Sequence, residues 1–143
     1  MRVWICRFAY DFMKNFKVFL KAKTEGAAEK FSAPARCFEE ADGRTFVFAA
    51  EGGHFRIHVG KEPYLERTGE LSYRFRLGNG RGNAVICTAY GDISVGVENV
   101  RFLQRMRGDS FFLKTNYVLF FPNFSQQHEI TFFAKEVSPL QDI

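Results

Sequence analysis

The strongest constraint on the fold is a two-residue alternation that runs from Tyr64 to Leu77. Its odd positions are apolar except for one arginine, and they are Leu65, Arg67, Gly69, Leu71, Tyr73, Phe75 and Leu77. Its even positions are polar or amphipathic. Because successive side chains of a β-strand point to opposite faces, the pattern predicts one long strand with one face in a core and the other in water. Gly69 is the expected kink in this strand.

The rest of the chain repeats this rhythm in shorter segments that are separated by turn residues. Alternation is found at residues 16–24, 29–39, 45–50, 55–59, 85–89, 93–104, 111–121 and 128–135. Asp42 with Gly43, and Gly52 with Gly53, are typical of tight hairpins. About ten short strands without a convincing helix after residue 15 predict an all-β antiparallel sandwich or closed barrel. The barrel is favoured because closure removes exposed sheet edges.

A chain of 143 residues fits one domain, and its eighteen phenylalanines suit a core built between strands. We divide it into an N-terminal extension at residues 1–15, a barrel at residues 16–135 and a tail at residues 136–143. Ile5, Phe8, Phe12 and Phe16 recur at helical spacing, so a short amphipathic helix is expected in the extension. Met13 opens a run that also looks like a natural start.

One segment, residues 93–104, changes the phase of its apolar positions. Val97 and Phe102 would point to opposite faces of an uninterrupted strand. One extra residue between Glu98 and Asn99, a β-bulge, would turn both side chains inward again.

The segment 111–121 is apolar on both faces, so its outer face needs a cover. Phe19 and Phe133 interrupt the polar faces of the first and last barrel strands in the same way. If those strands pair to close the barrel, the outer stripe consists of Phe19, Phe112, Phe120 and Phe133. The N-terminal helix or the second subunit of a homodimer would cover it.

The cysteines and the hydropathy indicate a compartment. Cys6, Cys37 and Cys87 form no CxxC and no Cys/His pair at ligand spacing, so we expect free thiols in a reducing environment and a cytoplasmic location. No segment approaches the roughly 20 apolar residues of a membrane span, so a membrane partner is not expected.

Three short segments carry a family resemblance: Arg67-Thr68-Gly69, Arg74-Phe75 and the run from Thr88 to Val95. They resemble the YwiB-like family of uncharacterised bacterial calycin-like β-barrel proteins, whose order of elements matches residues 13–135. The resemblance implies a lipocalin-like up-and-down barrel of about eight strands or more and no known reaction. Residues 1–12 have no counterpart in it, and the Gly-x-Trp signature of lipocalins is absent.

Arg67 is the residue that most strongly suggests binding, because its phase places a charge among apolar side chains and an unpaired buried charge is costly. Two interpretations stay open. In the first, Arg67 receives the carboxylate or phosphate of a small apolar or amphipathic ligand inside the barrel, with walls shaped by Tyr73, Tyr90, Thr115 and Tyr117. In the second, Arg67 closes one end of the barrel by donating to strand carbonyls.

Catalytic and metal-binding patterns are weak. The sequence has no nucleophile elbow and no carboxylate pair in an apolar setting, so a protein without enzymatic activity or cofactor is favoured over the open alternative of an enzyme of unassigned type. His54 and His58 would lie about 13 Å apart on one face of a strand, too far to share a metal ion, so no metal site is expected.

An alternative function follows from the arginines. Residues 67–107 contain seven arginines, three acids and no lysine. Arginine interleaved with aromatic residues suits phosphates and bases, so the alternative is an RNA-binding or protein-interaction module. Its outer face would consist of Arg74, Arg76, Arg81, Arg101 and Arg105.

Overall fold

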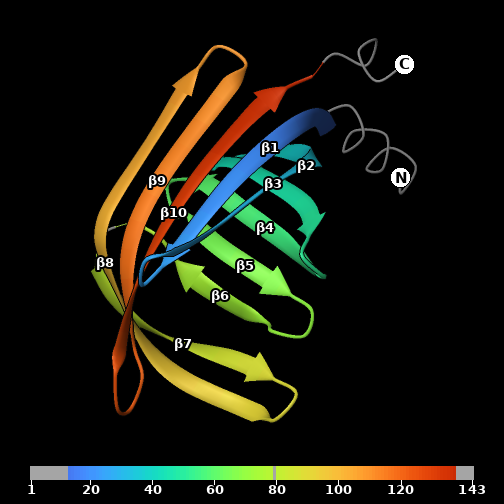
Figure 1. Ribbon diagram of the computed structural model, residues 1–143. Coiled ribbons are helices and arrows are strands. Elements are labelled where there is room, and N and C mark those ends of the chain that lie inside the picture. The colour runs from blue at the N-terminus through green and yellow to red at the C-terminus, as the bar shows by residue number, and fades with distance from the viewer. Residues whose placement is uncertain (1–12, 79, 138–143) are drawn as a thin grey trace, which may run out of the picture.

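The computed structural model describes residues 13–78 and 80–137, and this part of the chain folds as one curled antiparallel sheet. The strands are β1 (Met13–Thr24), β2 (Ala27–Glu40), β3 (Gly43–Ala50), β4 (Gly53–Gly60), β5 (Tyr64–Thr68), β6 (Tyr73–Arg76), β7 (Gly80–Thr88), β8 (Gly91–Arg107), β9 (Ser110–Phe120) and β10 (Ser125–Glu136). The sheet wraps into a nearly closed barrel (Figure 1), which confirms the predicted fold class.

The order of the strands is β6-β5-β4-β3-β2-β1-β10-β9-β8-β7. Tight turns connect strands that neighbour each other in the sequence, while β1 and β10 bring the two ends of the chain together. The first and last strands, whose pairing was the condition for the outer aromatic stripe, do pair, with Phe19 opposite Phe133. The helix predicted at residues 1–15 falls largely on residues 1–12, which lie outside the described residues, and β1 already begins at Met13.

The stretch from Tyr64 to Leu77 is a hairpin, so the prediction of one long strand was wrong. β5 and β6 pair antiparallel with Arg67 opposite Tyr73, and Gly69 lies in the turn with φ 144°. Because Arg67 and Tyr73 lie directly opposite each other, both side chains point to the same face of the sheet. The two residues are also an even number of positions apart in the sequence. The alternation therefore continues in phase through the turn, and Gly69, taken as a kink, marks the place where the chain reverses.

The predicted β-bulge is present in β8. The register between β8 and β9 shifts between Asn99 and Arg101, which makes Val100 the extra residue, one position beyond the predicted site. The side chain of Val100 is 65% exposed, while Val97 and Phe102 both pack on the core. The bulge therefore keeps one continuous apolar face along a bent strand.

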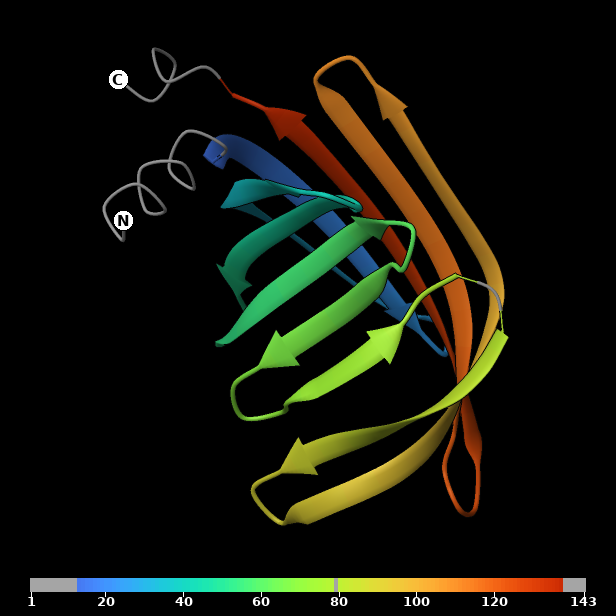
Figure 2. The same ribbon diagram turned by 180° about the vertical axis from the view of Figure 1, so that it is seen from behind.

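The two edges of the sheet, β6 and β7, meet at a seam where a few separate contacts stand in place of a continuous ladder. Ser72 and Cys87 form an isolated bridge, with nitrogen to oxygen distances of 3.0 and 2.8 Å. Farther along, Asn99 Nδ2 donates to the carbonyl of Arg76 at 3.0 Å. Elsewhere the β7–β8 hairpin diverges from β6, as Figure 2 shows. Side chains from both strands line an internal cavity beside this seam, among them Tyr73 and Phe75 of β6 and Ile86 and Thr88 of β7.

The core is densest in aromatic rings around Phe46, which is fully buried. Its ring centroid lies 5.2 Å from that of Phe16, 5.6 Å from that of Phe111 and 5.3 Å from that of Phe132. Each buried phenylalanine contributes about 1.5–3 kcal/mol relative to an exposed one. This aromatic cluster packs the part of the barrel near the β2–β3 turn.

The described cysteines are unpaired: Cys37 is buried and Cys87 is exposed. Burial raises the pKa of Cys37 to about 11, so its thiol stays protonated and behaves as a small apolar group. Among the described residues, no helix has the length and apolar character needed to cross a membrane.

Candidate functional site

The candidate site is a cavity of about 470 Å³ inside the barrel. It lies toward the β1–β2 and β3–β4 turns, where Thr24, Glu29 and Glu51 line its rim. Most of the wall is apolar and includes Phe31, Phe55, Leu65, Phe75, Leu119 and Ile130. The cavity therefore combines an apolar interior with a polar mouth.

Arg67 is the charged residue that β5 directs into this cavity. Its guanidinium carbon lies 5.4 Å from the centroid of the Phe55 ring, and Phe55 is its partner on β4. One terminal nitrogen donates to the carbonyl of Glu51 at a long 3.4 Å. Nε is buried and has no hydrogen-bond partner within residues 13–78 and 80–137. The guanidinium is thus held in place while part of its donor capacity is unused.

Tyr73 and Tyr117 contribute hydroxyl groups to the same cavity. Burial raises the pKa of Tyr73, and the neighbouring Arg67 guanidinium opposes part of that rise. Burial also raises the pKa of Tyr117, which is 4% exposed. Both phenols are therefore neutral at physiological pH and add no negative charge beside Arg67. Phe75 lies between them, with ring centroids 4.4 Å from Tyr73 and 5.7 Å from Tyr117.

His128 belongs to the cavity wall, although the sequence did not identify it as a site residue. Its ring stacks on Tyr117, its partner on β9, with centroids 5.1 Å apart. Burial lowers the pKa of His128, which favours the neutral ring. Thr24 Oγ1 lies 3.1 Å from Nδ1 and Gln126 Oε1 lies 3.2 Å from Nε2, so Nε2 donates and Nδ1 accepts. The place of His128 beside Tyr117 follows from the register between β9 and β10, which the sequence pattern does not show.

Two predicted wall residues do not line the cavity. Thr115 is fully buried, away from the cavity lining, and its Oγ1 has no partner in the described part of the chain. Tyr90 is fully exposed in the turn between β7 and β8. There Thr88 Oγ1 accepts from the Tyr90 amide at 3.1 Å and donates to the Gly91 carbonyl at 2.7 Å. This turn directs the Tyr90 ring into solvent. The position of Tyr90 just after a predicted strand did not indicate this direction.

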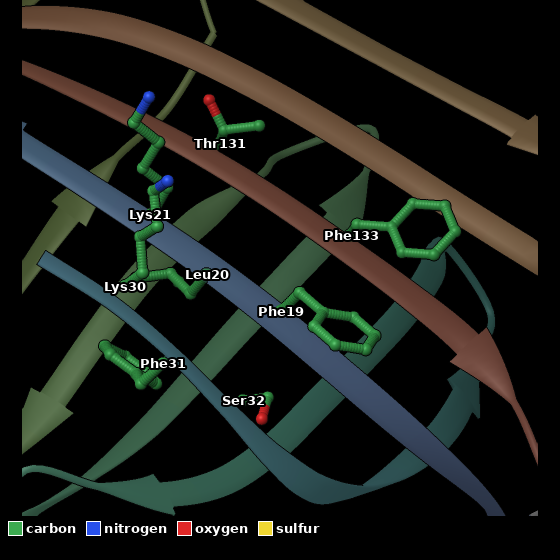
Figure 3. A pocket seen from close by; sticks show the side chains of 8 residues that line it. All are labelled: Phe19, Leu20, Lys21, Lys30, Phe31, Ser32, Thr131 and Phe133. Carbon is green, nitrogen blue, oxygen red and sulfur yellow. The ribbon is translucent and has the colours of Figure 1, made fainter.

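The outer aromatic stripe is shorter than predicted. Phe19 and Phe133 lie side by side on β1 and β10, with ring centroids 6.2 Å apart, and border a shallow groove of about 400 Å³ (Figure 3). Phe112 continues this row as the β9 partner of Phe133. Phe120 pairs with Ser125 at the far end of β9 and is separate from the row. What covers the row stays a prediction.

The outer arginines are spread over β6, β7 and β8, and two of them already have partners. Arg74 lies over the Tyr64 ring, with its guanidinium carbon 3.9 Å from the centroid. It also lies 3.8 Å from a carboxylate oxygen of Glu66. Arg81 forms an ion pair with Glu98 at 3.2 Å. These contacts reduce the positive charge that this face presents to a polyanion.

Fold and site together define a small antiparallel β-barrel with an internal cavity and an inward arginine. The structure is similar to the crystal structure of the ywiB protein from Bacillus subtilis, with a TM-score of 0.75 over 88% of this chain and 94% of that one. The two sequences are 11% identical, so the similarity concerns the fold. No protein-family model matches the chain, and no curated protein matches it in sequence.

Proposed function

We propose that this barrel is a non-enzymatic binding protein for a small amphipathic anion, with Arg67 as the anion contact. The observation that carries the proposal is the Arg67 guanidinium, which lines the cavity and has no carboxylate within 4 Å among the described residues. A charged group in an apolar wall is costly when it is not paired. A ligand carboxylate or phosphate would supply the missing negative charge, and an arginine can bind either group through two parallel hydrogen bonds.

The size and lining of the cavity support a ligand with a short apolar body. Its 470 Å³ fall within the about 300–1,000 Å³ that are typical of small-molecule sites. The neutral phenols of Tyr73 and Tyr117 provide further hydrogen-bonding groups. Glu129 also lines the cavity, and Lys114 pairs with its carboxylate at 3.1 Å, which reduces repulsion of an anion.

The fold similarity to the ywiB protein supports a second, evolutionary part of this proposal: the chain is a distant member of the YwiB-like, calycin-like barrels. The alternative, an arginine-rich face that binds RNA or protein, is less well supported, because Arg74 and Arg81 are engaged by acids of the same barrel. We therefore place the function inside the barrel.

A thermal-shift comparison of decanoate with decanol tests the proposal, because the two ligands share a chain and differ in charge. We expect decanoate to raise the melting temperature of the full chain more than decanol does, and Arg67→Met to abolish this difference. Arg56→Met is the matched control, since Arg56 is exposed on the neighbouring strand β4. Equal responses to both ligands, or a decanoate effect that survives in Arg67→Met, would contradict the assignment.

A further inference from the structure

A second cluster of polar side chains lies at the other end of β3 from the cavity. It consists of Glu40 at the end of β2, Asp42 in the β2–β3 turn and His58 on β4. One potential ligand atom from each residue lies within 4.8 Å of those of the other two. The two carboxylates are exposed, whereas His58 is only 3% exposed.

The hydrogen bonds of Thr45 decide which nitrogen of His58 is available. Thr45 Oγ1 lies 2.6 Å from Glu40 Oε1, and a carboxylate can only accept, so the single hydroxyl proton of Thr45 points to Glu40. Thr45 Oγ1 must then accept at its 2.8 Å contact with His58 Nδ1, which places a proton on Nδ1. In a neutral imidazole, Nε2 is consequently an acceptor with a free lone pair.

His58 Nε2 is the ring nitrogen that faces the carboxylates. It lies 3.3 Å from Asp42 Oδ2, and the ring is fixed in this orientation by stacking on Tyr64, with centroids 5.2 Å apart. The two atoms can share a proton or bind one metal ion between them.

The surrounding charges favour a cation at the same place. Neighbouring Glu39 is paired with Arg44 at 3.1 Å and with Lys14 at 3.8 Å. Over residues 13–78 and 80–137, neither Glu40 nor Asp42 has a lysine or arginine within 4 Å. The two carboxylates thus lie beside His58 without a lysine or arginine to neutralise them.

We propose that Glu40, Asp42 and His58 form a binding site for a divalent transition metal ion of the zinc type. One imidazole nitrogen and two carboxylates are ligands that zinc commonly takes, with water in the remaining position. Thr45 is the outer hydrogen-bond partner that fixes the tautomer of His58. The bound ion would tie the β2–β3 turn to β4, so its expected role is structural and independent of the cavity.

Calorimetric titration of zinc chloride into the full chain, freed of metal with a chelator, tests the site. We expect saturable binding of about one zinc ion per chain, weakened at least about tenfold in Asp42→Asn and in Glu40→Gln. Both substitutions are at exposed positions and should leave the fold intact. His54→Ala is the matched control, because His54 is exposed on the same strand, and it should bind zinc like the parent chain.

The melting temperature provides the second readout, since an ion that binds only the folded state stabilises it. Zinc should raise it in the parent chain and not in Asp42→Asn. A Cys6→Ser/Cys87→Ser variant should retain both effects, because the proposed ligands are Glu40, Asp42 and His58. The proposal would be overturned if zinc does not bind saturably. That is the result expected if His58 and Asp42 form only an ion pair with each other. Binding that survives in Asp42→Asn, or that is lost in His54→Ala or in the cysteine variant, would overturn it as well.

Discussion

Arg67 and Tyr73 are cross-strand partners on the β5–β6 hairpin, and both side chains reach the same cavity. The pair joins a fixed positive charge to a phenol in an apolar wall. Burial raises the pKa of the phenol, and the guanidinium opposes part of that effect. The hairpin thus brings a guanidinium and a neutral hydroxyl to the cavity from one short local element.

The first prediction concerns this electrostatic coupling. In Arg67→Met the pKa of Tyr73 should rise above its value in the parent chain, because burial then acts without the opposing positive charge. Alkaline titration followed by tyrosinate absorbance measures this, and Tyr73→Phe identifies which component belongs to Tyr73. Arg56→Met should leave that component unchanged. An unchanged titration in Arg67→Met would show that the two groups are not coupled.

The second prediction concerns the aromatic core. Phe46→Ala should lower the free energy of unfolding by about 3–5 kcal/mol, because it removes the ring at the centre of the cluster and leaves a cavity there. Phe124→Ala is the control, since Phe124 is 56% exposed, and it should cost less than about 1 kcal/mol. Denaturant unfolding measures both values, and similar losses would contradict the placement of the core.

The third prediction concerns the close approach of the β2–β3 turn to β4. A Cβ on Gly43 would lie 1.9 Å from the Val59 carbonyl oxygen, and its φ of +152° is unfavourable for other residues. Gly43→Ala should therefore destabilise the fold by about 2 kcal/mol or more. Gly82→Ala, in an open part of β7, should be nearly neutral. Thermal unfolding of both variants checks this, and equal melting temperatures would contradict it.

The sequence revealed features that depend on side-chain phase and missed those that depend on register between strands. The bulge near Val100 was predictable because it shifts the apolar positions. The turn at Gly69 was not, because an even step across it preserves the alternation. The inward direction of Arg67 follows from phase alone, so it was found.

The Glu40, Asp42 and His58 cluster illustrates the second case. The spacing argument for a metal site considered His58 only together with His54, the other histidine of β4. The carboxylates come instead from the β2–β3 turn, and they meet His58 because β3 pairs with β4 so that Thr45 lies opposite His58. Registers drawn from both hairpin signals, Asp42-Gly43 for β2 with β3 and Gly52-Gly53 for β3 with β4, would have brought these residues together.

The last prediction concerns acid stability and follows from the buried ring of His128. Burial lowers the pKa of His128 in the folded state below its ordinary value of 6.5, so the unfolded chain binds the proton more readily. The contribution of His128 to stability is therefore complete above the unfolded pKa and is lost as the pH falls toward the folded one. His128→Gln should reduce the decline in the free energy of unfolding between about pH 7 and pH 5.5. Denaturant titrations at several pH values measure this slope. His54→Gln, at an exposed position, should retain the slope of the parent chain, and the same retention in His128→Gln would show that the buried ring is not the group responsible.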